Sequence, residues 1–153
     1  MPKTTISPGT LLAPVPAVLV AAQGTSEALS RPNMLTVAWT GVVNSNPPML
    51  SISIQPIRHT HGQLLESGTF SVNLVSRPLL KKTDFCGVKR GRDMDKFAAC
   101  EWTAAYGKAL PQTPYIAECP VSLCCEIRHR QSLGSHDLFL AEIREVLVDE
   151  RLM

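Results

Sequence analysis

Two segments of the chain carry residue types that can hold a phosphate group. The first contains Arg58 and Thr60 and lies between an alternating apolar run, Met49 to Gln55, and an expected helix. The N-terminus of a helix offers unpaired N–H groups and the positive end of the helix dipole, so a guanidinium and a hydroxyl placed there favour phosphate binding. The alternative is that Thr60 is only a helix N-cap and Arg58 a solvated charge.

The second segment, Lys89 to Phe97, holds four cationic residues around one glycine and two acidic residues. Such a segment can clamp a dianion, although a run of charges is more often a solvated loop.

A third segment, Asn33 to Thr40, contains Trp39 among polar and small residues. It can offer backbone hydrogen bonds and a packing surface to a heteroaromatic ring, or Trp39 can simply belong to the core. Asn73 faces outward by strand alternation, toward solvent or a ligand hydroxyl.

Other kinds of site find no support in the sequence. The four histidines and five cysteines have no metal-ligand spacing, and we expect no metal. No nucleophile with a partnering base and no glycine-rich dinucleotide loop is present. The formal charge of +2 is too small to favour nucleic acid or an anionic membrane as a partner, and no run of about 20 apolar residues exists. Cysteines without a pairing pattern indicate a reducing compartment, so we expect a cytoplasmic protein.

The elements that must position these residues are mostly short strands. Runs of β-branched residues alternate with Pro, Gly and Asn turns, which is typical of a barrel or sandwich. We expect strands at 16–22, 35–43, 49–55, 70–75, 121–129 and 137–148, and short helices at 60–67, 78–85 and 93–97. The last two strands form a hairpin. The sequence therefore predicts one domain over 1–153, mainly β, with helices only in the connections and a barrel that closes its own edges.

These segments, in this order, resemble the flavin reductase-like family, which includes flavoredoxins. The resemblance rests on short matching stretches along nearly the whole chain: 31–41, 45–49, 58–60, 70–74, 84–87, 91–97 and 136–143. Membership would imply an FMN-binding split β-barrel, usually a homodimer that binds FMN without a covalent bond near the subunit interface.

The same resemblance implies roles for individual residues. The stretch Thr36, Val37, Ala38, Trp39, Thr40 would line the isoalloxazine ring. Arg58 and Thr60 would hold the phosphate, with Lys96 assisting. Asn73, Cys86 and Gly87 would lie near the ribityl chain or the ring. His136 would lie where such enzymes meet the nicotinamide or the exposed flavin face, as the one candidate catalytic residue.

Two departures from the family pattern stand out. Arg90 replaces an expected small residue such as serine, and the chain ends at Met153, earlier than is usual, so a truncated C-terminus would leave a more open site. The leading hypothesis of function is an NAD(P)H-dependent flavin reductase that passes a hydride from NADH or NADPH to FMN. The alternatives are an FMN electron carrier of flavoredoxin type, reduced by a redox partner protein, and a flavin-binding module without turnover.

Overall fold

The computed structural model describes residues 1–153, and its main element is a seven-stranded antiparallel sheet in the order β2-β1-β5-β8-β9-β4-β3. The strands are β1 (Val18–Ala22), β2 (Asn33–Val37), β3 (Thr40–Ser45), β4 (Pro48–Ile54), β5 (Thr69–Leu74), β8 (Val121–Ser132) and β9 (Asp137–Val148). A second, two-stranded sheet pairs β6 (Ala104–Tyr106) with β7 (Pro114–Ile116). The helices are α1 (His59–Ser67), α2 (Leu80–Val88) and α3 (Lys96–Cys100), with short 3-10 turns at Arg77–Leu79 and Glu150–Leu152.

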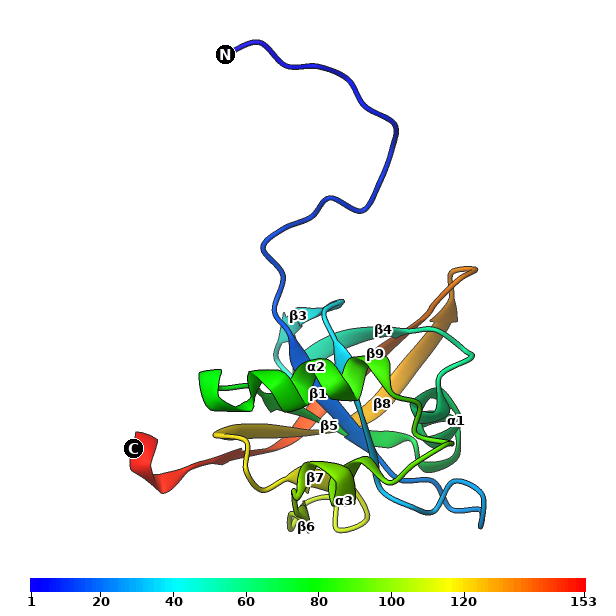
Figure 1. Ribbon diagram of the computed structural model, residues 1–153, viewed down its shortest axis with the longest axis vertical. Coiled ribbons are helices and arrows are strands. Elements are labelled where there is room, and N and C mark those ends of the chain that lie inside the picture. Colours follow the sequence, from blue (N-terminus) through cyan, green and yellow to red (C-terminus); the bar gives the residue numbers. More distant parts are fainter.

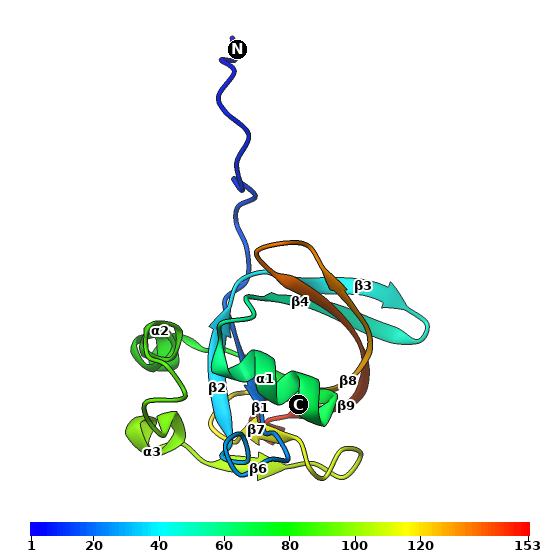
Figure 2. The ribbon, with the colours of Figure 1, turned by 90° about the vertical axis from the view of Figure 1, so that its right-hand side faces the viewer.

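The large sheet curls into a barrel shape with α1 at its inner side (Figure 2). The predicted mainly β, split-barrel architecture is thus confirmed. The barrel does not close its own edges as expected, because β2 and β3 are the two ends of the sheet and no strand pairing joins them. The chain crosses directly from one end of the sheet to the other between Val37 and Thr40.

Two apolar clusters hold the sheet from its two faces. The inner cluster is filled by Val20, Leu35, Ile52 and Phe70, and Leu64 from α1 packs into it. The outer cluster lies under α2 and α3, which cover β1 and β2 from outside the curl (Figures 1 and 2). Because both faces of β1 are covered, every residue of that strand is buried, and removing apolar side chains from water on both sides fixes its place in the sheet.

The expected single strand over 35–43 is wrong, since the structure has β2 and β3 with a break at Ala38 and Trp39. Val37 ends the pairing of β2 with β1, whereas Thr40 begins the pairing of β3 with β4. Most residues of this segment are good strand formers, with Ala38 and Gly41 as the exceptions. The change of partner is a long-range property that local propensity does not contain.

The predicted outward orientation of Asn73 is also wrong. Asn73 is fully buried, because β7 packs over the face of β5 that alternation assigned to solvent. Its Nδ2 donates to Leu19 O and Ser71 Oγ, at 3.0 and 2.9 Å. Its Oδ1 accepts from the Ile116 amide at 3.0 Å and from Ser122 Oγ at 2.7 Å. Asn73 therefore joins the large sheet to the small one.

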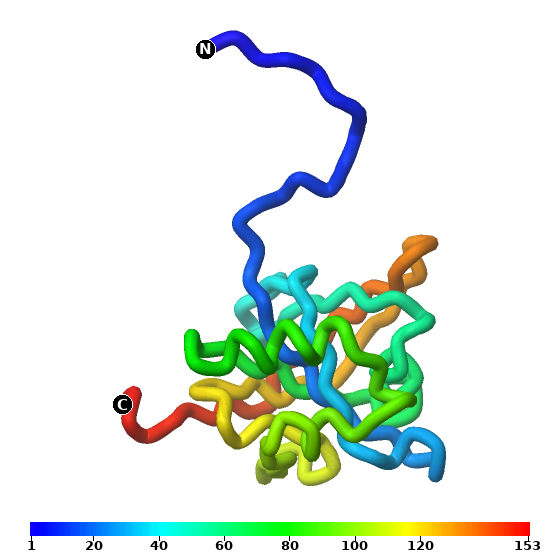
Figure 3. Tube along the Cα trace, in the orientation of Figure 1, coloured from blue at the N-terminus to red at the C-terminus, as the bar shows by residue number.

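The strands β6 and β7 were not predicted, whereas most of the other elements lie within a few residues of their predicted positions. The β8–β9 hairpin is present, and α1 ends at Gly68, which has a left-handed φ of 67° that glycine adopts without steric cost. The third helix begins later than expected, at Lys96, because Asp95 is its N-cap and accepts from the Ala98 amide at 3.0 Å. The first strand begins at Val18, and residues 1–17 extend away from the barrel without forming a helix or strand (Figure 3).

All five cysteines are free and buried. Burial raises the pKa of the Cys86 thiol to about 12, and the nearby Cys100 adds to this shift. Burial likewise raises the pKa of Cys119 to about 12 and that of Cys124 to about 11. Such thiols stay protonated and unreactive at neutral pH. None of the helices has the length and apolar character needed to cross a bilayer.

Candidate functional site

The candidate site lies where β2 and the end of β4 approach each other without pairing. Two adjoining pockets occupy this place and share Leu35, Gln55 and Arg58. The first, which we call the basic pocket, has a volume of about 260 Å³ and reaches α1 and the loop before α3. The second, called the Trp39 pocket, has a volume of about 200 Å³ and reaches His136 at the start of β9. Together they form one elongated depression with chemically different ends.

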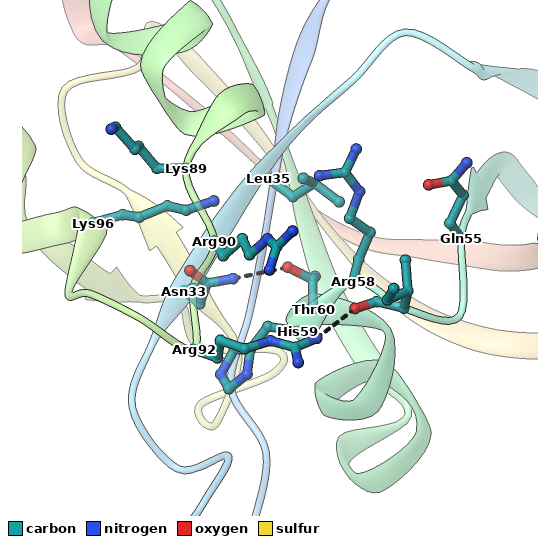
Figure 4. A pocket seen from close by; sticks show the side chains of 12 residues that line it. Asn33, Leu35, Gln55, Arg58, His59, Thr60, Lys89, Arg90, Arg92 and Lys96 are labelled. Carbon is teal, nitrogen blue, oxygen red and sulfur yellow. Dashed lines mark hydrogen bonds between the residues drawn. The ribbon is translucent and has the colours of Figure 1, made fainter.

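The basic pocket is lined by five cationic residues and no acidic one (Figure 4). These are Arg58, Lys89, Arg90, Arg92 and Lys96. Like charges gathered around one hollow repel each other and create a strongly positive local potential. An anion bound there would relieve the repulsion, so the electrostatics of this pocket favour a phosphate or another multiply charged anion.

Side chains tie together the three sequence segments that surround the site. Arg31 Nη2 donates to Gly91 O at 2.7 Å and to Met94 O at 3.0 Å. Arg92 Nη2 donates to Ile57 O at 2.9 Å, which fastens the same loop to the segment before α1. The predicted phosphate segments at 58–60 and 89–97 therefore line one pocket, together with Asn33 and Leu35 of the third segment.

Lys96 is a buried ammonium group at the wall of the basic pocket. Its Nζ donates to Met34 O at 2.8 Å and to Cys86 O at 2.7 Å. An ammonium has three N–H donors, so one is left for a ligand. Burial lowers the pKa of Lys96 to about 8, and the positive charge of Arg58 contributes to this shift. A bound anion would favour the charged form and raise this pKa again.

Thr60 lies in the first turn of α1 and is fully buried, and its Oγ1 accepts from Asn33 Nδ2 at 2.8 Å. The N-cap of α1 is Arg58, whose backbone is extended, so Thr60 is not the cap. Asn33 Oδ1 is buried and has no hydrogen-bond partner. Gly91 packs directly on this amide, since a Cβ on Gly91 would lie 2.4 Å from Asn33 Oδ1.

The Trp39 pocket is lined by five apolar and five polar residues. Its lining includes the consecutive residues Thr36, Val37, Ala38 and Trp39, together with His136. The rings of Trp39 and His136 have centroids 4.6 Å apart, and Ser135 Oγ lies 2.9 Å from His136 Nδ1. As an edge strand, β2 also leaves backbone groups on its outer side without a strand partner. A flat ring with polar edges suits such a place.

A buried pair connects the two ends of the site. His61 Nε2 on α1 and Asp137 Oδ2 on β9 are 2.8 Å apart, and both side chains are more than 90% buried. The hydrogen bond from His61 holds the pKa of Asp137 below its ordinary value. The pair joins α1, which follows Arg58, to β9, which follows His136. Partial burial lowers the pKa of His59, and the positive charges of Arg31, Arg92 and Lys96 lower it further.

Of the twelve residues to which the family resemblance gave individual roles, the structure brings eight to the two pockets: Thr36, Val37, Ala38, Trp39, Arg58, Thr60, Lys96 and His136. Four others do not line either pocket. Thr40 donates to Ser51 O at 2.8 Å within the sheet, and Asn73 joins the two sheets. Cys86 lies on the buried face of α2 and offers only its carbonyl to Lys96. Gly87 allows α2 to pack on Thr36, because a Cβ there would lie 3.2 Å from the Thr36 Cβ.

Sequence reasoning missed several residues of the site. Gln55, Ile57 and His59 line the basic pocket without having been assigned a role. His59 lies between Arg58 and Thr60, so its position beside a predicted phosphate site was an available signal. Gln55 lies at the end of a predicted strand, where polar side chains often reach a ligand. Asn33 belonged to a segment predicted to contact a heteroaromatic ring, whereas the structure places it in the basic pocket.

Comparison with known proteins places the chain in a family. Residues 12–153 match the flavin reductase like domain. An uncharacterized protein of Archaeoglobus fulgidus is 30% identical over 118 residues, which cover 77% of this chain and 66% of that protein. The match to a second relative covers 46% of that protein's length. This chain is therefore shorter than the relatives that it matches.

Two solved structures are similar over nearly the whole chain. Flavoredoxin of Desulfovibrio vulgaris (Miyazaki F) is 31% identical, with a TM-score of 0.88 over 97% of this chain and 78% of that one. Flavoredoxin from Methanosarcina acetivorans is 29% identical, with a TM-score of 0.90 over 100% of this chain and 78% of that one. On the sequence match and the shared fold, the chain belongs to the flavin reductase-like domain family.

Proposed function

We propose that this protein binds FMN in the two adjoining pockets and acts as an NAD(P)H-dependent flavin reductase. The single observation that carries the proposal is the continuity of the site. A pocket lined only by cationic and neutral residues opens at Arg58 into a pocket lined by an edge strand, Trp39 and His136. FMN has the same division, with a dianionic phosphate at one end and a flat heteroaromatic ring at the other.

The residues present fit this ligand. Arg58 has no hydrogen bond or ion pair from its side chain within the protein, and Lys96 keeps one free N–H. The Thr60 hydroxyl accepts from Asn33, so its own proton is available for a phosphate oxygen. The first turn of α1 adds the positive end of its dipole. We call Arg58, Thr60 and Lys96 the first phosphate site.

Bound FMN would supply the two-electron redox chemistry, while the polypeptide binds and orients it. Thr36 to Trp39 would hold the ring edge by backbone groups, which stabilises negative charge there without an acidic or basic side chain. His136 packs on Trp39 at that end of the site, where Trp39 is 47% exposed. A nicotinamide would have to approach from this same open side.

A second candidate function is an electron carrier that is reduced by a protein partner. The likeness to two flavoredoxins at 31% and 29% identity favours it. Stopped-flow mixing of the FMN-loaded protein with NADH and with NADPH separates the two. Rapid loss of the flavin absorbance with either nucleotide supports the reductase, whereas a flavin that stays oxidised with both supports the carrier.

FMN binding itself is tested by replacing Arg58 with alanine. A charge-assisted hydrogen bond contributes about 1.5–3 kcal/mol, so R58A should weaken FMN binding by about tenfold or more. Riboflavin lacks the phosphate, and its affinity should be the same for both proteins. Fluorescence titration measures all four affinities. An unchanged affinity of R58A for FMN would contradict the assignment.

Two further properties are part of the proposal. We propose a homodimer, supported by the edge strand β3, which exposes 79% of Val42 and 49% of Val43 to solvent. Sedimentation velocity of the wild type and of V42K would test this, with dissociation expected in the variant.

We also propose a cytoplasmic location, supported by five free and buried cysteines. Fractionation of the source cells would test it.

A further inference from the structure

The candidate site lies in a split of the barrel whose two sides are not joined by strand pairing. One side is β2, and the other is formed by β4 and its neighbour β9. Both pockets use both sides, since Leu35 of β2 and Gln55 at the end of β4 line each of them. Figure 2 shows α1 inside the curl, between β2 and the β8–β9 hairpin. The start of α1 is therefore placed to bridge the split.

Two consecutive residues of α1 bond to opposite sides of the split. Thr60 Oγ1 accepts from Asn33 Nδ2 on β2 at 2.8 Å. His61 Nε2 lies 2.8 Å from Asp137 Oδ2 on β9. The helix otherwise packs mainly on β1, β2 and β5, and the bond between His61 and Asp137 is the only hydrogen bond between α1 and β9. This one bond ties the start of α1 to the side of the split that carries β9.

Each member of the buried pair is also the sequence neighbour of a residue of the site. Thr60 of the first phosphate site directly precedes His61, and His136 of the Trp39 pocket directly precedes Asp137. The hairpin turn at 131–135 is exposed, whereas Asp137 is 5% exposed. Asp137 is thus the first buried anchor after the turn, and a shift of Asp137 moves His136 with it.

The chemistry of the pair points to geometry more than to stability. Both side chains are more than 90% buried, and the ring of Phe139 lies edge-on to His61 at 5.6 Å. In such surroundings apolar side chains of similar volume often stabilise a fold as well as a buried polar pair does. A hydrogen bond, however, holds its two groups within a narrow range of distance and angle. Arg130 is a second cation near the carboxylate, but it lies 3.9 Å away and is half exposed.

We infer that His61 and Asp137 are positioning residues, whose hydrogen bond sets the separation between the first phosphate site and the Trp39 pocket. The inference rests on the proposed function, since it takes one flavin phosphate to occupy both ends of the site. A ligand that is held at two ends gains from both only when the two sites stand at the spacing that it spans. Riboflavin has the ring without the phosphate, so its binding depends much less on this spacing.

The test breaks the pair from each side and compares the results with a restored bond. H61L removes the hydrogen-bond donor, and D137A removes the acceptor. In H61Q the side-chain amide can donate toward Asp137 again. N73A is the matched control, because it also breaks buried hydrogen bonds but Asn73 lines neither pocket. Urea denaturation gives the stability of each protein, and fluorescence titration below the unfolding transition gives its affinities for FMN and riboflavin.

The measured quantity is the preference for FMN over riboflavin, because a general loss of stability weakens the binding of both. We expect the preference to fall at least about fivefold in H61L and D137A and to stay within about twofold of the wild type in H61Q and N73A. Loss of the carboxylate alone makes the site more positive and favours FMN, so a fall in D137A is not an effect of charge. Should H61L not fold, D137A with H61Q still decides.

A wild-type preference in both H61L and D137A would overturn the inference. So would an equal loss in H61Q or in N73A, since the loss would then not depend on this hydrogen bond. The proposed function has a separate readout. If the wild type binds FMN no more tightly than riboflavin, the first phosphate site fails and the inference fails with it. If R58A loses the preference for FMN while H61L and D137A keep it, only the role of the pair fails.

Discussion

Asn33 Nδ2 donates a hydrogen bond to Thr60 Oγ1 over 2.8 Å, and both side chains are buried. This bond uses a lone pair of the hydroxyl, so the hydroxyl proton has to point elsewhere. The protein provides no acceptor for that proton. Asn33, on the edge strand β2, therefore makes Thr60 at the start of α1 a hydrogen-bond donor toward the basic pocket.

The polarity of this bond can be reversed by N33D. An aspartate carboxylate would accept the proton of Thr60 and would add a negative charge beside the phosphate. FMN binding should weaken by about tenfold or more in N33D and less in N33A, in which Thr60 stays free to donate. Titration with riboflavin is the control, because neither variant should alter its affinity much. Equal FMN affinities of N33D and N33A would contradict this role of Asn33.

The glycine above Asn33 should not tolerate a side chain. In G91A the new Cβ would lie 2.4–2.7 Å from three atoms of the Asn33 side chain, which is buried and bonded to Thr60. Overpacking of this kind costs about 1–3 kcal/mol of unfolding free energy. G41A is the matched control, since a Cβ at Gly41 meets nothing within 4 Å. Urea unfolding should show a loss for G91A and a change within about 0.5 kcal/mol for G41A.

Lys96 predicts a pH dependence of FMN binding. In the free protein its pKa is lowered to about 8 by burial, whereas a bound phosphate favours the ammonium form. Binding at a pH above 8 therefore requires the uptake of a proton, and the FMN affinity should fall by up to about tenfold per pH unit there. Riboflavin shares the isoalloxazine ring but not the phosphate, so it corrects for titration of the ring. Parallel pH profiles for FMN and riboflavin would speak against this role.

Asn73 should matter for stability and not for the ligand. Its Nδ2 and Oδ1 bond to Leu19, Ser71, Ile116 and Ser122, and truncation would leave several of these buried groups without a partner. N73A should lose at least about 2 kcal/mol of unfolding free energy, measured by urea denaturation. Below its unfolding transition it should keep the wild-type affinity for FMN. A folded N73A with strongly reduced FMN affinity would return this residue to the site.

The sequence allowed much of the site to be predicted, because local chemistry identified its pieces. Arg58 and Thr60 stand where a strand runs into a helix, and the cations of 89–97 cluster in one loop. Neither segment by itself excluded a capped helix or a solvated loop. They become one pocket only through the contacts of Arg31 with Gly91 and of Arg92 with Ile57. Such contacts join residues 35 and 60 positions apart, a relationship that no local pattern contains.

By itself the sequence determined the hairpin of β8 and β9, the end of α1 at Gly68 and the mainly β class, since alternation, glycine and turn residues act over a few neighbouring residues. Only the tertiary structure decided which strands pair and which faces are covered. The break at Ala38 and Trp39 arises because the chain changes its pairing partner there, from β1 to β4. Asn73 is buried because a second sheet covers β5. Arg58 and Lys96 line the same pocket because α1 and α3 both approach the unpaired edge of β2.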